Sequence, residues 1–228
     1  MVQKILKVKN SDCIESVNNF LKEILKSGKI HALLVQQDVP SKKISFPVFI
    51  TDPDRLNADV FSPILPSSTA TIVSRITKFQ PPKEPIGVVM RACQIRALIE
   101  LVKLNQANLD NIIIIGIDCL GTYPLNKYTN FTEKHTPTQY LIDDFNKKTK
   151  NAEKYIRPSC LICKDPIPTN ADITIGIFGM NINDELLVEA NSETGKKLIE
   201  DLKLDSVKEL KSRENAVQEI RNNKTKNR

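Results

Sequence analysis

Hydrophobic residues recur at helical spacing near the beginning of the chain. Within residues 12–25 the apolar positions fall on one face of a helix, and they are Ile14, Val17, Phe20, Leu21, Ile24 and Leu25. Asp12 and Glu15 have the spacing of a capping box, and Gly28 follows as a stop signal. This pattern predicts an amphipathic helix over residues 12–25.

Two short strands and a second helix are predicted next. Residues 30–35 form an apolar run, and residues 44–48 alternate between apolar side chains and Ser or Pro. Pro47 favours an edge strand, because proline has no backbone N–H to donate to a neighbouring strand. After a long loop, a helix is predicted to begin near Ser67 or Ser68, which are good helix-capping residues.

The middle of the chain has the pattern of a βαβ unit. Residues 86–90 and 111–117 are continuous runs rich in β-branched side chains, which is typical of strands covered on both faces, and residues 94–104 read as a helix between them. Such a unit predicts parallel strands with a right-handed crossover. Further strands and helices are predicted at residues 173–178, 186–189, 196–202 and 206–220. We therefore expect an α/β fold: a mostly parallel sheet with flanking helices, edge strands and a helical C-terminus.

Length and charge suggest one main domain with a short basic tail. The chain has 228 residues, 40% of them hydrophobic, and a formal net charge of +6. Residues 221–228 contain four basic side chains and no acid, so the body is nearly neutral. We expect a single domain over residues 1–220 and a basic tail over 221–228. Because the body shows no basic stripe interleaved with aromatics, we expect no nucleic-acid partner.

The sequence predicts a soluble cytoplasmic protein. No stretch reaches the roughly 20 apolar residues that a membrane-spanning helix needs, and the N-terminal residues lead into a charged segment rather than an uninterrupted apolar run. Disulfides are disfavoured in this setting, since the core is large enough not to require them. The five cysteines are therefore better considered as thiols.

Two cysteines directly follow the predicted strands of the βαβ unit. Cys93 comes after residues 86–90, and Cys119 comes after residues 111–117. Parallel strands end at the same edge of a sheet, where ligands of open α/β sheets bind. The helix that begins near Gln94 would also point its positive dipole end at this edge, which favours thiolates and an anionic group.

Cys160 and Cys163 form a Cys-x-x-Cys pair between prolines late in the chain, in a predicted loop. This spacing suits an iron–sulfur cluster, a structural zinc ion or a redox-active dithiol. We rank the cluster first, because zinc knuckles use two close pairs whereas Cys93 and Cys119 end sheet strands. The dithiol ranks last, because such motifs start a helix after an early strand. Cys13 shares a helix face with apolar residues and is predicted to be a core residue.

The cysteines lie in sequences that resemble a known family. Residues 91–98 (RACQIRAL), 116–119 (GIDC) and 160–165 (CLICKD) are similar to the beta-subunit family of coenzyme F420-reducing hydrogenase and F420-linked formate dehydrogenase. Further similarity lies in residues 61–63 (FSP) and 171–176 (ADITIG). The resemblance extends over nearly the whole chain and is most specific from Met90 to Cys163.

This resemblance implies an oxidoreductase subunit in which one 4Fe–4S cluster lies beside FAD. The implied cluster ligands are Cys93, Cys119, Cys160 and Cys163. The cluster would carry single electrons, and the flavin would convert them to hydride exchange with F420 or another low-potential carrier. The implied partners are other subunits of a hydrogenase, formate dehydrogenase or heterodisulfide-reductase-like complex.

The flavin contacts implied by the resemblance lie in the FSP element and the helix start after it. We expect them at Ser62, Pro63, Ser67, Ser68 and Thr69, because free amides at a helix N-terminus suit phosphate. An ordinary loop and helix cap would have the same residues. In the N-terminal part the family has a glycine pair, whereas this chain has the sequence SGKIH at residues 27–31. Two alternative functions are a flavin-free 4Fe–4S relay and a structural zinc-binding assembly module.

Overall fold

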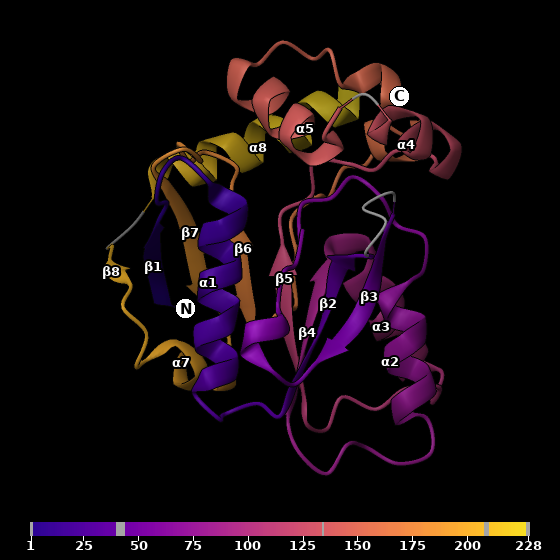
Figure 1. Cartoon of the computed structure of the whole chain (residues 1–228), viewed down its shortest axis with the longest axis vertical. Coiled ribbons are helices and arrows are strands. Elements are labelled where there is room, and N and C mark those ends of the chain that lie inside the picture. Colours follow the sequence, from indigo (N-terminus) through magenta and orange to yellow (C-terminus); the bar gives the residue numbers. More distant parts are fainter. Residues whose placement is uncertain (1, 40–43, 134, 208–209, 227–228) are drawn as a thin grey trace.

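A single mixed sheet forms the centre of the protein (Figure 1). The computed structural model describes residues 2–39, 44–133, 135–207 and 210–226. Within them the strand order is β3-β2-β4-β5-β6-β7-β1-β8. The strands are β1 (Val2–Lys7), β2 (Ala32–Asp38), β3 (Ser45–Ile50), β4 (Ile86–Arg91), β5 (Ile112–Ile117), β6 (Ile173–Gly176), β7 (Glu185–Ala190) and β8 (Asp205–Ser206).

Parallel pairing is confined to the centre of the sheet. Strands β2, β4, β5 and β6 run parallel to one another, whereas β3 on one side and β7, β1 and β8 on the other pair antiparallel. The α/β class is therefore confirmed, with a sheet that is mixed rather than mostly parallel. The expected edge position of Pro47 is also confirmed, because β3 is the outermost strand.

Helices cover both faces of the sheet and one of its ends. They are α1 (Cys13–Lys26), η1 (Pro53–Arg55), α2 (Thr69–Thr77), α3 (Ala92–Lys103), α4 (Leu125–Thr132), α5 (Pro137–Lys147), η2 (Glu153–Tyr155), α6 (Pro158–Leu161), α7 (Glu193–Ile199) and α8 (Lys211–Lys226). Helices α1 and α7 pack on one face, and α2 and α3 pack on the other. Helices α4, α5 and α8 gather at the end of the sheet where β4 and β5 finish (Figure 1).

The central strands show why continuous apolar runs occur in the sequence. In β5, Ile113 and Ile115 face the α1 side, while Ile112 and Ile114 face α2 and α3. Val89 in β4 likewise faces the α1 side, opposite to its neighbours. Side chains of both faces are buried because successive strand residues point in opposite directions. The predicted βαβ unit of β4, α3 and β5 is confirmed.

Several elements were not predicted, or begin elsewhere. Strand β1, helices α4 and α5 and the short β8 were missed, and α8 begins at Lys211 instead of residue 206. Helix α8 continues through residues 221–226 of the predicted tail, and residues 227 and 228 lie outside the described residues. No helix in the described ranges is both long and apolar enough to cross a membrane.

A buried ion pair fastens α8 to the sheet. The Arg213 guanidinium donates to both carboxylate oxygens of Asp118, with Nη2 2.9 Å from Oδ1. Asp118 also accepts the backbone N–H groups of Ile177 (2.9 Å) and Phe178 (3.1 Å). The Asp118 side chain is fully enclosed and that of Arg213 is 5% exposed. This pair therefore connects the residue directly before Cys119 to the C-terminal helix.

Candidate metal centre

Strand register brings Cys93 and Cys119 to the same edge of the sheet. Strands β4 and β5 pair in parallel with Arg91 opposite Ile117, and each cysteine lies two residues beyond its member of this pair. Cys93 is in the first turn of α3 and is exposed, whereas Cys119 is half-buried. The expectation that both thiols emerge at the carboxyl ends of neighbouring strands is confirmed.

Cys160 and Cys163 belong to a compact helical turn instead of the predicted loop. Cys160 lies in α6, and Cys163 follows one residue after the helix cap. The Cys160 N–H donates to the Arg157 carbonyl oxygen (2.9 Å), and the Cys163 N–H donates to the Cys160 carbonyl oxygen (3.2 Å). Pro158 at the first helical position favours this turn, because its fixed φ suits a helix start and its missing N–H is not needed there.

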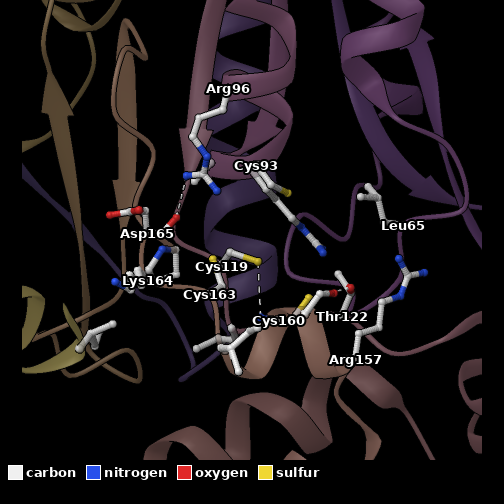
Figure 2. A pocket seen from close by; sticks show the side chains of 18 of the residues that line it. Leu65, Cys93, Arg96, Cys119, Thr122, Arg157, Cys160, Cys163, Lys164 and Asp165 are labelled. Atoms are coloured by element: carbon white, nitrogen blue, oxygen red, sulfur yellow. Dashed lines mark hydrogen bonds between the residues drawn. The ribbon is translucent and has the colours of Figure 1, made fainter. Parts of the chain in front are cut away.

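One cavity of about 610 Å³ contains all four cysteines in its wall. Figure 2 shows Cys93 reaching in from α3, with Cys119, Cys160 and Cys163 across the hollow from it. Leu65 and Thr122 contribute to the wall as well, and Ile220 of α8 borders it. Three segments that are distant in sequence thus meet at one site.

Cys13 is separate from this cavity. It begins α1, is buried in the core cluster on that face of the sheet and does not line the cysteine cavity. Burial and the neighbouring Asp12 raise the pKa of its thiol to about 12. The prediction that Cys13 is a core residue is confirmed.

Two of the four sulfurs already have hydrogen-bond partners. The Gly121 backbone N–H donates to Cys119 Sγ at 3.4 Å, and the Thr122 hydroxyl lies 3.4 Å from Cys160 Sγ. Gly121 has φ +107°, a conformation that residues with a Cβ rarely adopt, and a Cβ there would lie 3.0 Å from Ile156. The tight turn after Cys119 thus aims an amide at the sulfur.

Positive charge predominates around the cavity. Its wall contains four cationic side chains, Arg91, Arg96, Arg157 and Lys164, and one carboxylate, Asp165. Arg96 Nη1 donates to the Asp165 carbonyl oxygen at 3.0 Å, which holds this cation at the rim (Figure 2). Burial raises the pKa of the Cys119 thiol, while the Arg91 charge and the Gly121 N–H act in the opposite direction.

The donor set fits a thiolate-bound, negatively charged group. Four thiols share the cavity with cations and with N–H and O–H donors, and hydrogen bonds to sulfur are among the features that tune iron–sulfur clusters. In the part of the chain that the structure describes, no three side chains of His, Cys, Asp or Glu are placed so that they could hold a single metal ion.

The residues predicted to contact flavin are not among those that line the cavity, and several of them are used within the protein. The Ser62 hydroxyl lies between Ser45 (3.2 Å) and Tyr128 (3.1 Å), and the Thr69 hydroxyl accepts a hydrogen bond from Gln94 (2.9 Å). Pro63 is buried, and its carbonyl oxygen accepts the Tyr123 N–H. Ser67 and Ser68 are half-buried at the beginning of α2.

Sequence reasoning did not single out Arg91, Gly121, Thr122 or the Asp118–Arg213 pair. A weak signal existed for two of them. Arg91 is a cation at the end of a buried strand, and Asp118 is an acid between a buried strand and a cysteine. Charged residues in such positions are unusual because burying a charge requires a partner.

The comparisons with known proteins agree on one family. Residues 83–216 match the family model for the C terminus of the coenzyme F420 hydrogenase/dehydrogenase beta subunit. The chain is 28% identical over 225 residues to the F420-dependent formate dehydrogenase subunit beta of Methanocaldococcus jannaschii. It is 25% identical over 233 residues to the F420-dependent formate dehydrogenase 1 subunit beta of Methanococcus maripaludis. Each match covers 90% of this chain but 58% of the relative, so the chain spans little more than half the length of these relatives.

A solved structure has a similar fold. A chain from the xenon-derivatised F420-reducing [NiFe] hydrogenase complex of Methanosarcina barkeri aligns with a TM-score of 0.69 and 13% identity. The alignment covers 100% of this chain and 90% of that chain. At this identity the similarity concerns the fold.

Proposed function

This chain belongs to the coenzyme F420 hydrogenase/dehydrogenase beta-subunit family, and from this premise we propose that it is an iron–sulfur electron-transfer subunit of an F420-linked oxidoreductase. The proposed ligands of one 4Fe–4S cluster are Cys93, Cys119, Cys160 and Cys163. The observation that carries the proposal is their meeting in a single cationic cavity from three separate segments. Core packing does not explain why four of the five cysteines line one cavity.

The residues around the cavity have defined tasks in this proposal. A cluster, when bound, supplies one-electron chemistry at low potential. Gly121 and Thr122 orient two thiolates and donate hydrogen bonds to their sulfurs, while Arg96 and Lys164 offset negative charge at the rim. Cys93 is exposed, which supports a short path for electrons to another protein or cofactor.

We extend the proposal to F420, FAD and partner subunits. The family description and the names of the relatives support F420 as the carrier, in a complex of formate dehydrogenase or hydrogenase type. FAD would link single electrons to hydride transfer. Of the five predicted flavin contacts, Ser67 and Ser68 remain the best supported, because they are partly exposed at the N-terminus of α2, where amides suit phosphate.

Metal analysis of anaerobically purified protein tests the central claim. We expect brown protein with about four iron and four sulfide per chain, and visible absorption that dithionite bleaches. Flavin released by denaturation would support the FAD extension, and its absence would leave a flavin-free relay. Colourless protein with about one zinc per chain would overturn both redox functions, because zinc has no redox chemistry.

Single substitutions test the ligand set. Cys93→Ser, Cys119→Ser, Cys160→Ser and Cys163→Ser should each lower the iron content. Cys13→Ala is the matched control, since Cys13 lies in the core away from the cavity, and should keep its iron. Loss of iron in the Cys13 variant, or full iron in two or more of the others, would show that the ligand set is wrong.

A further inference from the structure

Arg91 is a buried cation whose charge is only partly satisfied. Its residue is 4% exposed, and its Nη2 donates to the Ser62 carbonyl oxygen. Nη1 is also buried and has no hydrogen-bond partner. Within the described ranges, none of the ion pairs includes Arg91. Among the described residues, the Arg91 side chain therefore has one acceptor, and this acceptor is a neutral carbonyl oxygen.

Such an arrangement is costly unless an anion completes it. Buried charges in proteins are paired or coordinated, and an unsatisfied buried donor costs about 1–3 kcal/mol, more if it is charged. Guanidinium groups are suited to burial because they present several N–H donors in a fixed plane. The burial of Arg91 therefore points to a negatively charged group nearby.

Asp59 does not supply that anion. The charges of Asp59 and Arg91 interact, but the Thr138 hydroxyl donates to Oδ2 of Asp59, and Oδ1 is buried without a partner. Burial raises the pKa of Asp59 to about 7, and the attraction of Arg91 is a minor opposing effect. A true counterion of a buried arginine would have a lowered pKa.

The cysteine cavity is where such an anion would bind. Arg91 contributes to its wall, ends β4 and directly precedes the turn that holds Cys93. Arg91 therefore shares the cavity wall with Cys93 and Cys119, which follow the two strand ends.

We propose that the Arg91 guanidinium, which belongs to the cavity wall, acts on the thiolate-bound cluster through its positive charge and raises the reduction potential of that cluster, which deepens and rests on the proposed function. Reduction adds one electron, taken from the partner that reduces the protein, and makes the cluster more negative. A fixed buried positive charge stabilises this reduced form more than the oxidised one. No proton needs to move, because arginine remains charged in both forms.

A redox titration of the iron-loaded protein, followed by electron paramagnetic resonance, tests the proposal. In Arg91→Gln the ratio of reduced to oxidised cluster at a fixed solution potential should fall about tenfold, which is a shift of 59 mV to more negative potential for one electron. Arg91→Lys keeps the charge and should shift by less. Arg75→Gln is the control with the same charge change at an exposed residue of α2, and should match the wild type.

Iron and sulfide content, measured on the same samples, separates the two ideas. Protein without a cluster would refute the proposed function itself. Protein with a full cluster whose potential is equal in Arg91→Gln and wild type would overturn the role of Arg91 and leave the cluster in place.

A second measurement needs no Arg91 variant, in case that variant fails to fold. Wild-type protein labelled with ¹⁵N at the guanidinium nitrogens of arginine should show ¹⁵N coupling in pulsed paramagnetic resonance of the reduced cluster. The coupling should persist in Arg96→Gln and Arg157→Gln, which remove the other arginines of the cavity wall. Its absence from the wild type, or its loss in either variant, would contradict the proposal.

Discussion

Two buried arginines act on the same short segment around Cys119, and they differ in how their charge is satisfied. Arg213 comes from the C-terminal helix and has a buried carboxylate, Asp118, on both of its terminal nitrogens. Arg91 comes from the end of β4 and has one carbonyl oxygen, with Nη1 unpartnered. Equal burial of the same residue type therefore serves two purposes. The first arginine holds the fold together, whereas the second retains binding capacity for an anion.

Among the variants that test this comparison, Arg213→Met should lose the most unfolding free energy. Arg213→Met would leave the Asp118 carboxylate buried with two backbone N–H donors, and removal of one partner of a buried pair costs about 3–5 kcal/mol in unfolding free energy. Urea denaturation followed by circular dichroism measures this loss. The double variant with Asp118→Asn should lose less than the sum of the two single variants. A loss below about 1 kcal/mol in Arg213→Met would contradict a structural role.

The pH dependence of stability should depend on Asp59, which interacts with Arg91. Its pKa is raised by burial from the ordinary 3.8 to about 7, so between these values the folded protein keeps a proton that the unfolded chain has released. Unfolding free energy should therefore fall as pH rises through this window, by at most about 1.4 kcal/mol per pH unit, and level off above it. Asp59→Asn should flatten this slope. The Arg91 charge lowers the pKa of Asp59, so Arg91→Gln should raise this pKa further and extend the slope to higher pH. Arg213→Met should not.

The close approach of α8 to the sheet gives a third prediction. Gly179 has φ +79°, and a Cβ there would lie 2.5 Å from the Ser212 carbonyl oxygen, so Gly179→Ala should push α8 and Arg213 away from Asp118. We expect a loss of about 1–3 kcal/mol. Gly28→Ala is a matched control with φ +70° and open space around the position, so it tests strain without the clash. Equal losses in the two variants would show that the contact with α8 is unimportant.

Arg91→Gln should have the smallest effect on stability. It removes one hydrogen bond to the Ser62 carbonyl oxygen but also a charge that the protein itself satisfies poorly, so we expect a change of about 1 kcal/mol in unfolding free energy. The same urea titration as for Arg213→Met measures it. A loss as large as that of Arg213→Met would remove the distinction between the two arginines.

Much of the centre of the fold could be predicted because local pattern and topology agree there. The apolar runs of β4 and β5 show strands covered on both faces, and the parallel βαβ rule places the residues after them at one edge. Cys93 and Cys119 could therefore be assigned to one site from the sequence. Cys160 and Cys163 were found through their spacing alone.

The end of the sheet was harder to predict because tertiary contacts shape it. Helices α4 and α5 have short apolar stripes, and an aromatic cluster stabilises them, in which the Phe131 ring lies 4.8 Å from Tyr155 and 5.1 Å from Tyr140. Strand β1 depends on pairing with β7, and the paired residues lie 178–188 positions apart in the sequence. Local periodicity does not report such distant partners.

The charge around the site was missed for the same reason. Arg91 meets the Ser62 carbonyl oxygen 29 residues away, and Arg213 meets Asp118 95 residues away. The sequence contains both arginines, but which of them is neutralised becomes visible only in three dimensions.

The pairing of Arg91 with Ile117 also determines where the chain can change in length. Cys93 and Cys119 each lie two residues beyond their member of this pair. Deletion of one residue inside β5 would therefore exchange the two faces of the strand and move Cys119 out of register with Cys93. The connection over residues 104–111 lies between α3 and β5 at the opposite end of these strands, and it can gain or lose residues without altering the offsets. Insertions and deletions between these two cysteines should therefore concentrate in that connection.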